Sequence, residues 1–123
     1  MKEALLQGRC VLVVEDEYFI ADAMQRGLRK AGARVVGPAA SVAEALALLQ
    51  AEPVDGAVLD LNLDNEKTFP VADALEARGI PFLFATGYNL ADIPPDWRHV
   101  TRCEKPVDMA AVAHVLNSGE GAP

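Results

Sequence analysis

Short apolar runs alternate with stretches of mixed polarity along most of the chain. Near-continuous apolar runs are typical of strands buried on both faces of a parallel sheet, and they predict strands at 9–14, 33–36, 56–60, 82–86 and 100–103. Between and after these runs, apolar residues recur at helical spacing, which predicts helices at 17–31, 41–50, 70–78 and 107–116. The chain is therefore expected to alternate strand and helix.

Three local features refine the boundaries and the core. Ser41 and Glu44 have the spacing of a capping box, in which each side chain binds a backbone N–H group at the start of a helix. The Pro94–Pro95 pair disfavours a regular helix at 89–97, because proline lacks the N–H donor and clashes with the preceding turn. Three aromatic residues within the predicted elements are expected in the core, namely Phe19, Phe82 and Phe84.

Alternating strands and helices predict an α/β fold with a parallel sheet and right-handed crossovers. The doubly wound strand order 2-1-3-4-5 suits five strands, and it places a ligand crevice between the first and third strands. The fourth helix is expected to be shortened or irregular because of the proline pair. We expect one domain at 9–118, with an extension at 1–8 and a frayed tail at 119–123.

Composition supports a folded domain and limits its partners. The 123 residues are 51% apolar, which suits one domain with a substantial core. Lys and Arg number 11 against 18 Asp and Glu, and the resulting net charge of −7 disfavours nucleic-acid binding. There is no signal-peptide pattern and no run of about 18 apolar residues, so no membrane association is expected. Cys10 and Cys103 form no disulfide or zinc framework, which favours a reducing cytoplasm.

Polar side chains stand at the carboxyl ends of four predicted strands. Asp60 ends the third strand, and Glu15 and Asp16 follow the first. Thr86 ends the fourth strand, and Lys105 follows the fifth. Because the carboxyl ends of parallel strands meet at one edge of a sheet, these groups are expected to lie close together. Three acids, a hydroxyl and an ammonium group indicate a site for a divalent metal and a phosphoryl group.

This set of residues, with the Lys105–Pro106 pair, resembles the bacterial response-regulator receiver domain, and the resemblance runs from Arg9 to about Leu116. The sequence Pro-Phe-Leu-Phe-Ala-Thr-Gly-Tyr at 81–88 also resembles the atypical FAT-GUY receivers. Members of that subfamily are often stand-alone receivers or belong to general stress-response signalling. The resemblance implies a flavodoxin-like (βα)5 fold and a signalling module of two-component phosphorelays, which is not an enzyme and acts through contact with a downstream protein.

The resemblance also assigns roles to single residues. Asp60 would accept a phosphoryl group from a histidine kinase or a histidine phosphotransferase. Thr86 would hydrogen-bond that group and Lys105 would pair with it, and the Lys105–Pro106 peptide is often cis in such domains. Mg²⁺ would be held by three carboxylates and one backbone carbonyl, those of Glu15, Asp16, Asp60 and Asn62.

One position departs from the common receiver pattern. Many receivers carry an aromatic switch residue three positions before the lysine, where this chain has Arg102. Rotation of a buried aromatic at that position therefore cannot carry the output. We expect the segment from Gly87 to Trp97 to become ordered on phosphorylation and to be read by the partner. Tyr88, two residues after Thr86, is the nearest aromatic that could report on the site.

Two other classes of function remain open at this stage. A phosphatase of the haloacid dehalogenase type would also use an aspartate nucleophile, but it usually has a second aspartate two positions later, where this chain has Asn62. A degenerate receiver would act as an interaction module without phosphorylation. The presence of Asp60, Thr86 and Lys105 argues against that class.

Overall fold

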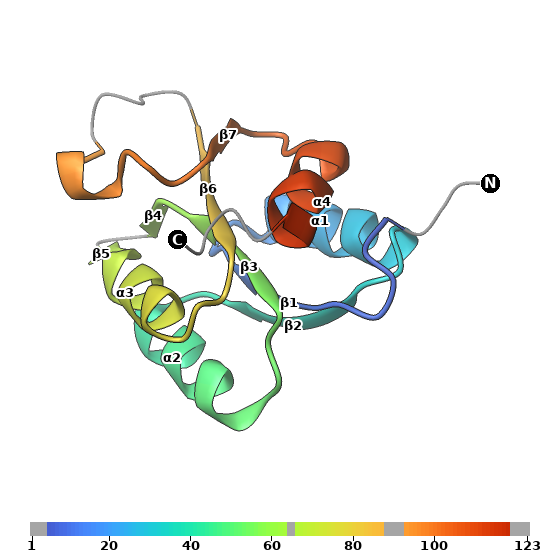
Figure 1. Cartoon of the computed structure of the whole chain (residues 1–123), viewed down its shortest axis with the longest axis horizontal. Coiled ribbons are helices and arrows are strands. Elements are labelled where there is room, and N and C mark those ends of the chain that lie inside the picture. The colour runs from blue at the N-terminus through green and yellow to red at the C-terminus, as the bar shows by residue number, and fades with distance from the viewer. Residues whose placement is uncertain (1–4, 64–65, 88–92, 119–123) are drawn as a thin grey trace.

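A five-stranded parallel sheet forms the centre of the structure, a computed structural model that describes residues 5–63, 66–87 and 93–118 (Figure 1). The strand order is β2-β1-β3-β6-β7. Because β6 and β7 are the fourth and fifth strands of this sheet along the chain, the predicted order 2-1-3-4-5 and the doubly wound α/β fold are confirmed. The strands are β1 (Cys10–Val14), β2 (Arg34–Ala39), β3 (Gly56–Asp60), β6 (Phe82–Thr86) and β7 (Arg102–Glu104).

Helices cover both faces of the sheet, with α1 and α4 on one side and α2 and α3 on the other (Figure 1). Leu12 and Val14 of β1 pack with α2 and α3, whereas Val11 and Val13 pack with α1 and α4, because side chains alternate along a strand. No helix in the described ranges is long and apolar enough to cross a membrane. The helices are α1 (Tyr18–Lys30), α2 (Val42–Ala51), α3 (Phe69–Ala77) and α4 (Met109–Ser118).

The described part of the predicted N-terminal extension, residues 5–8, packs against the domain. Leu6 is fully buried in the core on the side of α1 and α4. Its N–H group donates to the carbonyl of Ala31 at 2.7 Å, and the N–H group of Gly8 donates to the carbonyl of Gly32 at 3.2 Å. These residues therefore close the core at the end of α1.

Side-chain caps fix where two of the helices begin. The Ser41 hydroxyl accepts from the N–H group of Glu44 at 3.1 Å, and the Glu44 carboxylate accepts from the N–H group of Ala40 at 3.0 Å. This is the predicted capping box, with its second bond one residue earlier than in the standard form. At α4, the Asp108 carboxylate accepts from the N–H group of Ala110 at 3.1 Å, so the helix begins two residues later than the predicted 107.

Two features of the strands differ from the sequence-based prediction. A short antiparallel pair, β4 (Asn62–Leu63) and β5 (Glu66–Lys67), follows β3 and was not predicted, because two-residue strands have no measurable periodicity. β2 continues to Ala39 through Gly37 and Pro38, although the predicted strand ends at 36. Gly37 has a φ of +98° and a Cβ atom there would lie 2.9 Å from the carbonyl oxygen of Val13, so glycine is required at this close approach.

The proline-rich segment after β6 contains no regular α-helix in its described part, as predicted. Pro95–Trp97 forms a single 3₁₀ turn, η2. Trp97 is buried, stacks on Phe69 with ring centroids 5.8 Å apart, and meets Phe84 edge-on at 6.2 Å. This aromatic cluster joins the turn to α3 and to β6.

The three phenylalanines expected in the core have different outcomes. Phe82 and Phe84 are fully buried, as predicted. The prediction for Phe19 is wrong, because its side chain is 77% exposed. Phe19 shares a helix face with Ala23 and Arg26, which are exposed, whereas the buried stripe of α1 contains Met24.

The two outer strands of the sheet differ from the inner three. β1, β3 and β6 are buried along their whole length. β2 is partly exposed and contains Pro38, and β7 has only three residues, of which Arg102 and Glu104 are exposed.

Candidate functional site

Three carboxylates meet at the carboxyl ends of β1 and β3. The two strands are neighbours with Val14 level with Leu59, so the residues that follow them are adjacent. One carboxylate oxygen from each of Glu15, Asp16 and Asp60 lies within 4.8 Å of the others. Glu15 is 3% exposed and Asp60 is 6% exposed, whereas Asp16 lies at the surface. The acid cluster predicted from the strand ends is therefore present.

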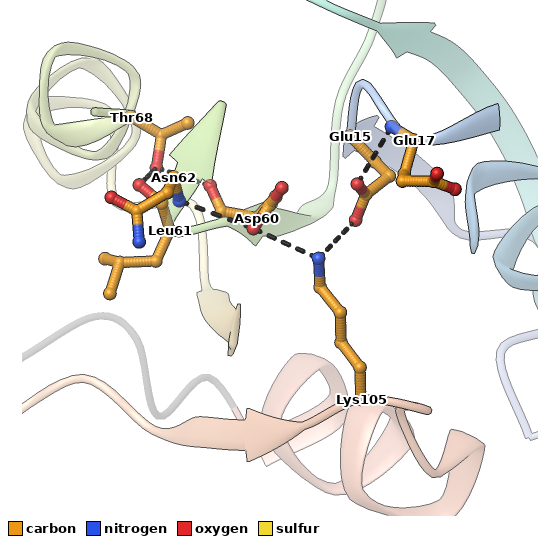
Figure 2. A network of polar contacts seen from close by, with 7 residues as sticks. All are labelled: Glu15, Glu17, Asp60, Leu61, Asn62, Thr68 and Lys105. Atoms are coloured by element: carbon orange, nitrogen blue, oxygen red, sulfur yellow. Dashed lines mark hydrogen bonds and ion pairs between the residues drawn. The ribbon is translucent and has the colours of Figure 1, made fainter. Parts of the chain in front are cut away.

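Lys105 reaches into this cluster from the end of β7 (Figure 2). Its Nζ atom lies 2.9 Å from Oε1 of Glu15 and 3.2 Å from Oδ1 of Asp60. Its backbone N–H group donates to the carbonyl of Thr86 at 2.9 Å, which fixes the start of the β7–α4 connection against β6. The Lys105–Pro106 peptide is cis, as expected. One ammonium group thus bridges the carboxylates of two different strands.

The protonation of Asp60 and Lys105 reflects burial and mutual charge. Burial, together with the negative charge of Glu15, raises the pKa of Asp60 to about 6, although the nearby Lys105 ammonium opposes the rise. Burial alone would lower the pKa of Lys105, but its contacts with Glu15 and Asp60 outweigh burial and raise that pKa. A buried acidic site with one bridging ammonium group favours the binding of a further cation.

Thr86 supplies a buried hydroxyl group at the same edge of the sheet. Asp60 is level with Ala85 on the neighbouring strand β6, so Thr86 stands one residue beyond Asp60. Its side chain is buried, and its Oγ1 atom has no hydrogen-bond partner among the described residues. A buried hydroxyl without a partner is unfavourable. This one is therefore available to an oxygen atom of a ligand.

The backbone after Asp60 is held in place by Thr68, which the sequence did not indicate as a site residue. The N–H group of Asn62 donates to Oδ1 of Asp60 at 3.3 Å, and the Asn62 side chain accepts a hydrogen bond from Lys67. Thr68 is fully buried, and its hydroxyl donates to the backbone carbonyl of Asp60 at 2.8 Å (Figure 2). The only sequence signal for Thr68 is its place before Phe69 and Pro70, which reads as an ordinary helix cap.

The residues predicted to carry the signal are dispersed. Gly87 and Arg102 are exposed, and Arg102 is level with Phe84 of β6. Trp97 is buried in the core cluster with α2 and α3, so its side chain is not at the surface for a partner to read. Tyr88 lies outside the described residues.

An apolar groove of about 370 Å³ borders the acid cluster between α1 and the β7–α4 connection. The exposed Phe19 and the buried Met24 line it from α1, and Pro106 and Met109 line it from the other side. Lys105 belongs both to this groove and to the acid cluster. A protein seated in the groove would therefore be next to Asp60.

The acid cluster fits a magnesium ion by its donor chemistry. Mg²⁺ prefers a small number of carboxylate oxygens together with water and phosphate oxygens. Glu15, Asp16 and Asp60 supply such carboxylates, and Asp16 opens the cluster to solvent. No sulfur or imidazole ligand belongs to this cluster, so it does not resemble a zinc site.

Comparisons with known proteins agree with this geometry. The family model of the response regulator receiver domain matches residues 11–94. The transcriptional regulatory protein YvrH of Bacillus subtilis (strain 168) is 33% identical over 82 residues, which are 66% of this chain and 35% of YvrH. The chain thus spans about a third of the length of that relative.

Two solved structures of SdrG are also similar along nearly the whole chain. The solution structure of SdrG from Sphingomonas melonis Fr1 is 39% identical with a TM-score of 0.78, covering 96% of this chain and 98% of SdrG. The BeF3-activated conformation of SdrG, from Pseudomonas melonis Fr1, is 40% identical with a TM-score of 0.73, covering 89% and 93%. The sheet order and the acids at the ends of β1 and β3 agree with the matching family model. The chain therefore belongs to the response regulator receiver domain family of two-component signalling.

Proposed function

We propose that the protein is a Mg²⁺-dependent receiver in which Asp60 accepts a phosphoryl group from a histidine kinase or a histidine phosphotransferase. The observation that carries the proposal is the buried Asp60 carboxylate, which has Glu15 on one side and the Lys105 ammonium in contact. Phosphoryl transfer needs an aligned nucleophile and neutralisation of negative charge, with little other help from the protein. This site offers both.

The two oxygens of Asp60 have different surroundings, which suggests separate roles. The ammonium of Lys105 and the N–H group of Asn62 both contact Oδ1, at 3.2 Å and 3.3 Å. Among the described residues, no hydrogen bond or ion pair reaches Oδ2. We therefore assign Oδ2 as the atom that attacks phosphorus, and Oδ1 as the oxygen that orients the carboxylate.

The remaining site residues would balance the charge of the phosphoryl group. Glu15, Asp16, Asp60 and the backbone carbonyl of Asn62 would hold Mg²⁺, which supplies positive charge to the phosphoryl oxygens. Lys105 would pair with one phosphoryl oxygen, because its ammonium already lies beside Asp60. The Thr86 hydroxyl, buried and without a partner among the described residues, would donate to another.

The groove beside Lys105 would seat the phosphodonor. An amphipathic helix with a phosphorylated histidine can place apolar side chains against Phe19 and Met109. Because Lys105 lines both this groove and the acid cluster, the phosphohistidine would then face Asp60. This contact would cover the side chain of Phe19, which is exposed on α1.

Membership of the family bears on one of the two alternatives that the sequence left open, the phosphatase. Receiver domains are phosphoacceptor signalling modules and not enzymes, so the phosphatase alternative is set aside. A degenerate receiver would act without phosphorylation and would not need Asp60, Thr86 and Lys105. All three residues are present and lie at one edge of the sheet, which argues against this alternative. Cys10 and Cys103 are both free thiols, which supports the proposal of a cytoplasmic location.

The output of the receiver is proposed to depend on the residues that follow Thr86. A stand-alone receiver in a stress response is suggested by the resemblance of the motif at 81–88 to the FAT-GUY receivers. Phosphorylation would bias the connection between Gly87 and Trp97 through Thr86. Because Trp97 packs on Phe69 and Phe84, the change at η2 would involve the aromatic cluster as well as the surface.

Intact-mass measurement after incubation with acetyl phosphate and Mg²⁺ tests the proposed function. The wild type should gain about 80 Da as an acyl phosphate, and Asp60→Asn should gain nothing. Omission of Mg²⁺ should prevent the gain in the wild type. A wild type that stays unmodified, or an Asp60→Asn variant labelled as fully as the wild type, would refute the assignment.

A further inference from the structure

Thr68 makes three contacts with the backbone carbonyls of Asp60, the proposed phosphoacceptor, and of Leu61, the residue after it (Figure 2). Its hydroxyl donates to the carbonyl of Asp60 at 2.8 Å and lies 3.4 Å from the carbonyl of Leu61. Its own N–H group donates to the same Leu61 carbonyl at 3.3 Å. Thr68 is fully buried, so each of these bonds is shielded from water.

The hydroxyl is directed to Asp60 because α3 has no use for it as a cap. A threonine before a helix normally accepts a hydrogen bond from the second or third N–H group of that helix. Here the second helical residue is Pro70, which has no N–H group, and the N–H group of Val71 donates to the backbone carbonyl of Thr68 at 3.0 Å. The side chain of Thr68 makes no cap bond to α3 and donates in the opposite direction.

These bonds fix the two peptide groups between Asp60 and Asn62. The carbonyls of both peptides are held by Thr68, and the N–H group of Leu61 donates to the carbonyl of Ala85 at 3.0 Å on the other side. The backbone of Asn62 is thereby positioned, and its N–H group orients the Asp60 carboxylate at 3.3 Å. The carbonyl of the same Asn62 is the proposed backbone ligand for Mg²⁺.

We infer that Thr68 is a positioning residue for the metal ligands and for the nucleophile Asp60, acting from the position just before α3 through the backbone of Leu61 and Asn62. This inference rests on the proposed function of Asp60. Residues that orient ligands in this way commonly affect metal affinity by about 10- to 100-fold when they are replaced. The inference also explains why a buried polar side chain belongs to the core beneath the site.

Replacement of the hydroxyl with retention of shape tests the inference. Thr68→Val should weaken Mg²⁺ binding to the unphosphorylated protein, measured by titration calorimetry, on the order of tenfold. Labelling by acetyl phosphate at saturating Mg²⁺ should slow by about the same factor. Amide hydrogen exchange at Leu61 and Asn62 should become faster. Thr68→Ser keeps the donor and should restore Mg²⁺ affinity and labelling to near the wild-type values.

Val71→Ala is the matched control for a purely structural role, because it removes buried volume from the same turn of α3 and leaves the hydroxyl in place. All measurements are made at a temperature where each variant is folded. If Val71→Ala weakens Mg²⁺ binding as much as Thr68→Val does, or if Thr68→Ser fails to restore it, Thr68 only stabilises the fold and the inference is overturned.

The experiment separates this inference from the proposed function. Absence of labelling in the wild type would contradict the proposed function, whereas the Mg²⁺ titration and the amide exchange would still decide the role of Thr68. A wild type that binds no Mg²⁺ would overturn both. Normal labelling and Mg²⁺ affinity in Thr68→Val would overturn only the inference.

Discussion

Asp60→Asn should stabilise the metal-free protein at neutral pH, although it removes the phosphoacceptor. Asp60 is buried and its pKa is raised from 3.8 to about 6, first by burial and then by the charge of Glu15. Each pKa unit corresponds to about 1.4 kcal/mol of difference between the protonation states. The ionised carboxylate therefore lowers the free energy of unfolding by up to about 3 kcal/mol. Asparagine removes the charge with nearly the same shape.

The pH dependence has a definite sign. Because the pKa of Asp60 is higher in the folded protein, the folded state binds more protons than the unfolded state between pH 3.8 and about 6. The penalty is fully present above about pH 6 and is lost as the pH falls toward 3.8. The advantage of Asp60→Asn should therefore be large at about pH 7.5 and much smaller at about pH 4.5.

Thermal and urea unfolding in the presence of a chelator measure this effect. For a domain of 123 residues, 1 kcal/mol shifts the Tm by about 4 °C, so an increase of up to about 12 °C is expected at about pH 7.5. Asp73→Asn is the matched control, because it removes one charge from an exposed position and should change the Tm little. The reasoning is refuted if Asp60→Asn leaves the Tm unchanged or lowers it at about pH 7.5, or if its gain is equally large at about pH 4.5.

Three further predictions concern the metal, the donor and the fold. Asp16→Asn should abolish most of the stabilisation by Mg²⁺, which for the wild type is about 2.7 kcal/mol when the Mg²⁺ concentration is 100 times the Kd. The rise in Tm across a Mg²⁺ titration measures this stabilisation, and a rise as large as in the wild type would exclude Asp16 as a ligand. Phe19→Gln should change the free energy of unfolding by no more than about 0.5 kcal/mol. It should slow phosphorylation by a cognate kinase more than phosphorylation by acetyl phosphate, and an equal slowing of both rates in phosphotransfer assays would contradict docking in the groove. Ser41→Ala should lower the free energy of unfolding by about 1 kcal/mol through loss of the α2 cap, and urea unfolding with an unchanged midpoint would contradict it.

The sequence predicted the features that depend on one element and on the direction of a parallel sheet. The apolar runs located the strands because both faces of the inner strands are buried: Val58 packs on the side of α1 and α4, and its neighbour Leu59 packs on the side of α2 and α3. Glu15 and Asp60 could be brought together because parallel neighbours end at the same edge of the sheet. The contact of Lys105 with both acids agrees with this argument, because β7 ends at that edge as well.

Features that depend on three-dimensional neighbours could not be predicted in the same way. Thr68 reads as a helix cap, and only the position of the Asp60 carbonyl makes it a donor to the site. Phe19 has helical spacing from other apolar residues, but it falls on the face of α1 that the sheet does not cover. The burial of Trp97 follows in part from stacking on Phe69, which lies at the start of α3 and is separated from Trp97 along the chain by the rest of that helix and by β6.

The two outer strands have a consequence for how this domain avoids aggregation. An added strand needs a row of unpaired N–H and C=O groups on a long, flat edge. Pro38 interrupts that row on β2, because proline has no N–H group to offer. β7 offers only three residues, and the exposed charges of Arg102 and Glu104 would have to be accommodated by the incoming chain. The described sheet is therefore protected at both edges against growth by strand addition, which leaves helices and loops as the surfaces through which other proteins recognise it.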